Sequence, residues 1–169
     1  MATIDIKFKF IDTDGNDYEH YEEFEVESGL LASIEEFGED YVHDDPDEIS
    51  EFTDWSVYDY DSDFMDPESF TDLDEYAEYV GKCEKHGEAY RLRYEDIGDH
   101  DFEEEYNGCW GNEEEFVENL IEERSRYEEC YDINIPSFLH IDWERTTRDV
   151  MMDYSSYDGS EGCHIFRNC

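Results

Sequence analysis

The sequence predicts an α+β fold. Apolar and polar residues alternate near both ends of the chain, whereas the middle carries apolar residues at helical spacing. The expected order is strands with a helix, then helices, then helices with strands, which favours small antiparallel sheets over a doubly wound parallel sheet. We expect an N-terminal subdomain over 1–66, a central helical subdomain over 67–111 and a C-terminal subdomain over 112–169.

The first subdomain is predicted to hold an antiparallel sheet and one helix. Residues 4–11 alternate Ile and Phe with Asp and Lys, as expected of a half-buried strand. The turn-forming residues 12–17 lead to a second strand over 18–26. Apolar residues at helical spacing predict a helix over 29–41, and residues 55–60 alternate again and are predicted to join the sheet.

The rest of the chain is predicted to be mostly helical. After an acidic loop over 61–70, we expect a helix over 72–85 capped by Thr71, followed by helices over 88–97 and 101–106. A turn at 108–111 is predicted to lead to a helix over 113–129 and then to an extended stretch at 133–141. The chain is expected to end with a helix from the cap Asp142 through 151, a turn at 159–162 and a strand at 163–167.

The helix predicted from residue 113 combines a core-facing stripe with an unusual number of carboxylates. Asn112 and Glu115 form a capping-box pattern at its start. The apolar residues that recur at the helical period are Phe116, Val117, Leu120 and Ile121. Three glutamates spaced by four line an outer face: Glu114, Glu118 and Glu122. Like charges at this spacing destabilise a helix, so either the face is simply solvated or its negative charge is functional.

Charge dominates the composition. The 52 Asp and Glu outnumber the 11 Lys and Arg and give a net charge of −41. Residues 10–81 contain 27 acids and no Lys or Arg. Aromatic residues make up 17% of the chain, which favours a folded protein with a thin aromatic core over an acidic disordered one.

So much negative charge repels nucleic acid and anionic membranes, and the expected partner is therefore a basic protein. At the charge density of duplex DNA, the net charge corresponds to roughly 70 Å, or about 20 base pairs. That length is the scale of a DNA-binding groove. One helix face with a carboxylate in every turn is sparser than a DNA strand, so several elements would have to contribute.

No catalytic, cofactor or metal motif stands out. The five cysteines form no CxxC, and no signal peptide or membrane-spanning run is present, which together indicate a reduced cytosolic protein. Asp12, Asp14, Asn16 and Glu23 match a calcium loop in spacing, but Asp17 stands where glycine is required, and a hairpin turn explains them better. We expect no enzyme activity, no cofactor and no metal site, although weak, non-selective cation binding is expected.

Several segments, in this order, resemble the ArdA antirestriction family of plasmids, transposons and phages. They are 55–60 (WSVYDY), 101–108 (DFEEEYNG) with 112–120 (NEEEFVENL), 140–149 (HIDWERTTRD) and 164–168 (HIFRN). The resemblance covers most of 52–169, whereas the first fifty residues match poorly.

The resemblance implies an elongated three-part α+β fold that mimics bent B-form DNA, and a homodimer. It further implies that the protein occupies the DNA groove of type I restriction–modification enzymes in the cytoplasm of a bacterial host. The residues carried over as mimics of DNA charge are Asp101, Glu103, Glu104, Glu105, Glu113, Glu114 and Glu115. We add Glu118, Glu122, Asp59, Asp61 and Asp63 to this candidate DNA-mimic surface.

Three functions of different classes fit the sequence. The first is a DNA-mimic inhibitor of restriction enzymes that protects incoming phage or plasmid DNA. The second is an acidic inhibitor or chaperone of another basic nucleic-acid-binding protein, for example a CRISPR or nucleoid protein. The third is a cation-buffering protein. Competition with a DNA duplex separates the first from the second, and calcium calorimetry separates the third.

Overall fold

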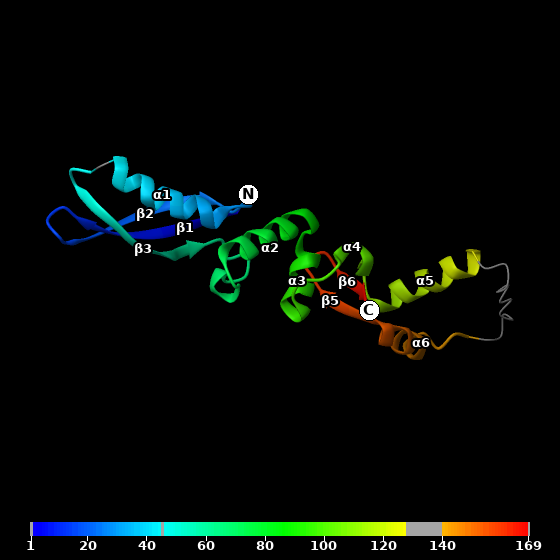
Figure 1. Cartoon of the computed structure of the whole chain (residues 1–169). Helices are drawn as coiled ribbons and strands as arrows, with labels where there is room; N and C mark the ends of the chain where they lie inside the picture. The colour runs from blue at the N-terminus through cyan, green and yellow to red at the C-terminus, as the bar shows by residue number, and fades with distance from the viewer. Residues whose placement is uncertain (1, 45, 128–139, 169) are drawn as a thin grey trace. The chain divides into compact units, whose positions relative to one another are not determined.

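The computed structural model describes residues 2–44, 46–127 and 140–168 (Figure 1). The chain divides into two compact units, Met1–Gly87 and Glu88–Cys169. In the described residues, each unit holds one three-stranded antiparallel sheet together with helices, which confirms the predicted α+β class. The division into subdomains at 1–66, 67–111 and 112–169 stays a prediction.

The sheet of the first unit has the strand order β2-β1-β3, with β1 at Thr3–Asp12, β2 at Asp17–Glu25 and β3 at Ile49–Tyr60. The central strand β1 alternates as predicted, because every second side chain enters the core. Its buried residues are Ile4, Ile6, Phe8 and Phe10. All three strands were expected, but β3 begins at Ile49 rather than at 55.

The turn between β1 and β2 is held by one carboxylate. Asp12 Oδ1 accepts hydrogen bonds from the backbone N–H of Asp14 at 2.9 Å and of Asn16 at 2.8 Å. The bond from the Asn16 side chain is the main reason why the pKa of Asp12 lies below its usual value. Glu23 lies along β2 opposite Asp5. The calcium-loop spacing is therefore that of a hairpin turn.

Helix α1 (Leu30–Asp44) packs against this sheet (Figure 1). Ile34 is fully buried, and the Phe37 ring lies 4.9 Å from the ring of Phe8. At Gly38 the helix backbone comes so close to the sheet that a Cβ atom would lie 2.7 Å from the Phe52 ring. Glycine therefore sets how closely α1 approaches β3.

Helix α2 (Leu73–His86) follows a short 3₁₀ turn at Pro67–Ser69. Its cap is Asp72, whose Oδ1 accepts from the backbone N–H of Glu75 at 2.9 Å, so the predicted cap Thr71 is wrong by one residue. Thr71 instead donates its backbone N–H to Glu75 Oε2. The buried face contains Tyr76, whose pKa burial raises to about 12.

The second unit surrounds a sheet of order β4-β6-β5. Its elements are α3 (Glu88–Ile97), α4 (Phe102–Glu105), β4 (Tyr106–Trp110), α5 (Glu113–Tyr127), α6 (Trp143–Val150), a 3₁₀ turn at Met151–Asp153, β5 (Tyr154–Asp158) and β6 (Cys163–Arg167). The helices, the cap Asp142 and the last strand agree with the sequence prediction.

Two strands of this unit differ from the prediction. The turn predicted at 108–111 is wrong, because residues up to Trp110 form β4 and Cys109 pairs with His164 of β6. Gly108, at φ 101°, lies at an irregularity in that pairing. Strand β5 was not predicted, since its sequence YSSYD lacks apolar alternation.

The core beside α5 contains the apolar face expected for that helix. Phe116 and Val117 are buried against Cys163 and Ile165 of β6, and Leu120 and Ile121 pack partly buried around them. The extended stretch predicted at 133–141 lies outside the described residues except for 140–141, which form no strand, and the predicted end of α5 at residue 129 also lies outside.

Candidate anionic interaction surface

The second unit brings two of the predicted acidic runs to the two ends of β4. Asp101, Glu103 and Glu104 begin the short helix α4, and the first turn of α5 carries the other run. The exposed members of the two runs are Asp101, Glu103, Glu104, Glu114 and Glu115. Glu113 and Glu118 are half-buried, and Glu122 is exposed.

Hydrogen bonds to the backbone fix some of these carboxylates. Asp101 Oδ1 accepts from the N–H of Glu104 at 3.2 Å and caps α4. Asn112 Oδ1 accepts from the N–H of Glu115 at 2.9 Å, as the capping box predicts. Glu115 Oε2 accepts from the N–H of Gly111 at 2.8 Å, one residue before the expected partner. Because a carboxylate held by the backbone keeps its charge at a defined position, the helix starts present ordered negative charge.

Glu105 does not belong to the exposed surface, and its assignment there is wrong. Its side chain is buried and accepts hydrogen bonds from Arg93 Nη2 at 3.1 Å and Nε at 3.3 Å. Arg93 also donates from Nη1 to the Tyr157 hydroxyl at 2.9 Å, and that hydroxyl donates to Asp96 at 2.6 Å. Glu105 therefore neutralises a buried guanidinium and joins α3 to α4.

Arg93 was not singled out from the sequence, although a signal was present. It lies three and four residues after Tyr90 and Ala89, which are also buried, so it belongs to the inner face of α3. A buried arginine needs a carboxylate partner. That requirement predicts that the side chain of one nearby acid is buried beside Arg93, but it does not identify which acid.

In the first unit, Asp59, Asp61 and Asp63 are all exposed, as expected. Asp59 lies opposite Asp5 in the sheet. Asp61 Oδ1 accepts from the backbone N–H of Asp63 at 3.0 Å, so the regular spacing of the three reflects a strand end followed by a tight turn.

The face of this sheet that points away from α1 carries the two lysines of β1. Lys7 Nζ lies 2.6 Å from Glu19 Oε1, and Lys9 Nζ lies 3.5 Å from Asp54 Oδ2. The hydrogen bond between the first pair raises the pKa of Lys7 and lowers that of Glu19. These pairs neutralise the lysines and leave the acids of the same face in excess.

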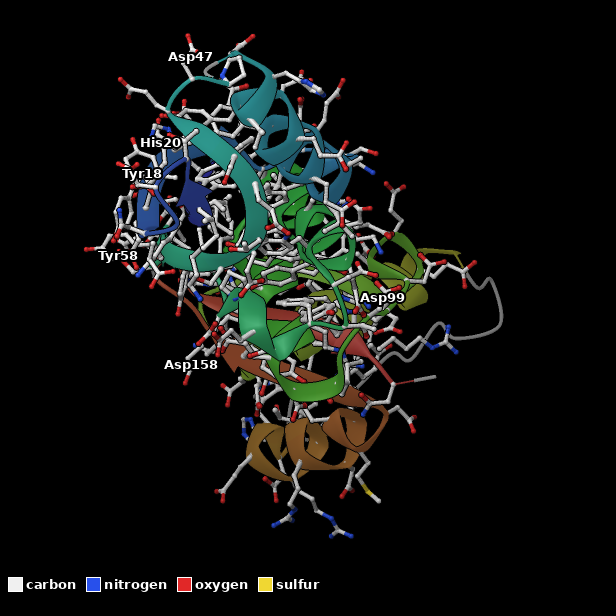
Figure 2. All side chains as sticks on the ribbon, turned by 60° about the vertical axis from the view of Figure 1, so that its left-hand side comes forward. Tyr18, His20, Asp47, Tyr58, Asp99 and Asp158 are labelled. Atoms are coloured by element: carbon white, nitrogen blue, oxygen red, sulfur yellow. The ribbon has the colours of Figure 1, made fainter. Side chains whose placement is uncertain are left out.

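Tyr21 and Tyr58 project from that face and are 45% and 65% exposed, with their rings edge to face at 4.8 Å. Figure 2 shows oxygen-tipped side chains projecting all around the ribbon, with Tyr58 labelled among them. Acids outnumber bases in each of the two units, and many oxygen-tipped side chains accordingly project in that view.

The described residues contain no group of three or more His, Cys, Asp or Glu side chains arranged to hold a metal ion. None of the described helices is long and apolar enough to cross a membrane. The arrangement presents fixed negative charge, and the chemistry open to it is the binding of cationic groups.

Comparison with known proteins gives one result for this chain. A family model described as "Antirestriction protein (ArdA)" matches residues 33–164, from within α1 to the second residue of β6. No curated protein and no solved structure matches the chain.

Proposed function

Because the chain belongs to the ArdA antirestriction family, we propose that it protects incoming phage or plasmid DNA by occupying the DNA-binding groove of type I restriction–modification enzymes. In this proposal the protein acts as a homodimer in the cytoplasm of the bacterial host, without a cofactor and without catalysing a reaction. It binds the basic groove of the enzyme and does not bind nucleic acid itself.

The observation that carries the proposal is the set of exposed acids at the starts of α4 and α5. Two of them, Asp101 and Glu115, accept backbone hydrogen bonds at 3.2 Å and 2.8 Å and are therefore held in place before binding. A pre-ordered charge loses little conformational entropy on binding. The lysines and arginines of the enzyme that neutralise phosphates when DNA is bound would contact these fixed carboxylates instead of the phosphates.

Charge arithmetic requires that several elements act together. Successive acids of one helix face, such as Glu114 and Glu118, are about 6 Å apart along the axis. One strand of DNA carries a charge about every 3.4 Å. The acids at the starts of α4 and α5 would therefore have to act together to approach the charge density of a duplex.

The proposal is tested by plating an unmodified phage on a bacterial strain that carries a type I restriction system. Expression of the chain is expected to raise plating toward the level on a non-restricting strain. Because the surface is diffuse, Glu114→Gln alone should leave protection nearly intact, with a binding loss of about 1 kcal/mol or less. Neutralising Asp101, Glu103, Glu104, Glu113 and Glu114 together should abolish it.

Unchanged plating of the phage on cells that accumulate the folded wild-type protein would contradict the proposal. Loss of protection by Glu114→Gln alone, in a folded protein, would point to a localised site instead of a diffuse one.

A further inference from the structure

The outward face of the first sheet carries two exposed aromatic rings, Tyr21 of β2 and Tyr58 of β3. Strand β1 lies between β2 and β3, so the two rings meet across the central strand, with their centroids 4.8 Å apart. Tyr58 is the more exposed of the two and is labelled in Figure 2. We call this surface the Tyr21–Tyr58 face. Large apolar side chains exposed together on a folded protein are typical of a contact surface.

A β-bulge places a carboxylate directly beside the Tyr58 ring. Asp59 pairs with Asp5 of β1, and Val57 pairs with the next residue, Ile6, so Tyr58 is an extra residue between the two pairs. Tyr58 and Asp59 therefore lie opposite the same stretch of β1, and both are exposed. Bulges redirect side chains and often occur beside functional sites.

The acids of this face are arranged at a cost to stability. Asp5 lies opposite Glu23 of β2 as well as Asp59 of β3, so three carboxylates form one row across the sheet. Like charges directly opposite each other destabilise a sheet. The nearby Lys7 does not neutralise the row, because its Nζ lies 2.6 Å from Glu19 Oε1. A cationic partner would relieve the repulsion within the row.

The rings of this face also accommodate a cation. Lys7 Nζ of the chain itself lies over the Tyr21 ring, 6.0 Å from its centroid. A cation in this position is attracted by the electrons of the ring face. The Tyr58 ring, with 65% of the residue exposed, offers the same kind of contact to a cation from outside the chain.

We propose that the Tyr21–Tyr58 face docks an arginine-bearing surface of the target protein. A planar guanidinium would stack on the Tyr58 ring, and the row formed by Asp5, Glu23 and Asp59 would neutralise its charge. A second copy of this chain does not fit, because its own acids would meet the row. The inference rests on the proposed function in taking the arginine from the target's DNA-binding groove. It adds an aromatic contact, through which the protein would discriminate among basic grooves.

The first test needs no target. The full chain is titrated with a capped tri-arginine peptide and, separately, with a tri-lysine peptide of the same charge, while the ring proton shifts of its tyrosines are followed by NMR. We expect saturable shifts at Tyr21 and Tyr58 with tri-arginine that exceed both those at Tyr18 and those with tri-lysine. Shifts at the pair no larger than at Tyr18, or equal shifts with the two peptides, would overturn the proposal.

The second test compares variants that leave the net charge unchanged. Tyr58→Ser removes the exposed ring, whereas Tyr58→Phe keeps it. The control Tyr18→Ser removes a tyrosine of β2 that is 39% exposed but lies opposite the buried Phe10, on the other face of the same sheet. Met152→Ser, at a residue of the second unit that is 78% exposed, is a further control without core contacts to lose. All are assayed for displacement of a labelled recognition duplex from a type I enzyme.

Tyr58→Ser is expected to weaken displacement about fivefold, whereas Tyr58→Phe and the folded controls should displace the duplex as the wild-type protein does. Equal displacement by folded Tyr58→Ser and wild type would overturn the docking face and leave the proposed function standing. A changed oligomeric state of Tyr58→Ser in sedimentation would assign the face to a second copy and also overturn the proposal. If the wild-type protein displaces no duplex, the proposed function fails, and the peptide titration decides on the face by itself.

Discussion

At the scale of single residues, Glu105 of the second unit is an acid that is buried, whereas its neighbouring acids are exposed. Glu103, Glu104 and Glu105 are chemically equivalent in sequence, yet only Glu105 is buried, because Arg93 of α3 lies opposite it. The Arg93 guanidinium also lies over the rings of Tyr157 and Phe166. This buried pair joins α3 to α4, and the bond from Arg93 to the Tyr157 hydroxyl adds β5 to the contact.

Arg93→Met is expected to destabilise the second unit by about 3–5 kcal/mol, because Glu105 would remain buried without its partner. Arg145→Met is the matched control. Its side chain is 72% exposed, and its pair with Asp149 at 3.8 Å should contribute less than about 1 kcal/mol. Urea denaturation followed by circular dichroism gives both values. Equal losses for the two variants would show that the buried pair is not structurally important.

A second prediction at the residue scale concerns the stability of the protein at acidic pH. Glu88 Oε2 accepts from the backbone N–H of Ser160 at 2.7 Å and from its hydroxyl at 2.9 Å, and these bonds lower the pKa of Glu88 below its usual 4.5. The unfolded state therefore binds this proton more readily than the native state. Its contribution to stability is present above pH 4.5 and is lost as pH falls through the lower, native pKa.

Glu88→Gln keeps an acceptor for Ser160 but removes the titration. The variant is expected to lose less free energy of unfolding between neutral pH and pH values below 4.5 than the wild-type protein does, as measured in urea. Glu95→Gln, an exposed acid of the same helix, serves as the control. An acid-induced loss identical in Glu88→Gln and wild type would remove this role of Glu88.

At the scale of elements, local pattern predicts the structure where one face is apolar. The strand β1 and the inner faces of α2 and α5 follow directly from period and capping. The strands β4 and β5 could not be predicted in the same way. Their sequences YNGCW and YSSYD carry little apolar alternation, and they become strands only because β6, whose CHIF stretch is buried, lies between them.

The sequence predicts that the candidate surface is acidic, but it does not predict which of its acids is buried. Exposure of Asp101, Glu103 and Glu104 follows from their charge, whereas burial of Glu105 depends on a contact with another helix. A hollow of the second unit likewise brings Glu114 of α5, Thr147 of α6 and Ser156 of β5 together across long stretches of chain, so spacing along the sequence does not predict it.

The prediction at the scale of elements concerns two glycines that lie within helices. Gly38→Ala in α1 should destabilise the first unit despite the better helix propensity of alanine, because the new Cβ would lie 2.7 Å from the Phe52 ring. Gly81→Ala in α2 meets no atom within 4 Å and should stabilise the same unit by up to about 1 kcal/mol. Thermal unfolding of both variants checks the opposite signs. A stabilising Gly38→Ala would mean that α1 does not pack this closely on β3.

At the scale of the whole molecule, charge repulsion is the main term that folding must overcome. The chain carries a net charge of −41, and several of its bases are already paired with neighbouring acids, as Lys82 is with Glu78 and Arg91 with Glu88. A surface kept this negative costs stability, which is consistent with a function that needs the charge.

Added salt at neutral pH is therefore expected to raise the melting temperature, since screening weakens repulsion between the exposed carboxylates. Scanning calorimetry at about 10 mM and 150 mM NaCl measures the effect. The variant with Asp101, Glu103, Glu104, Glu113 and Glu114 neutralised should gain less from the same salt. A melting temperature that falls with salt would mean that attractive ion pairs outweigh the repulsion.

Competition with DNA tests the central claim most directly. A labelled duplex bound to a type I restriction–modification enzyme is titrated with the protein at several DNA and salt concentrations. DNA mimicry predicts full displacement, an apparent Kd that rises in proportion to the DNA concentration, and an affinity that falls steeply with salt. A complex that holds enzyme, duplex and protein together, or binding unaffected by DNA, would contradict it.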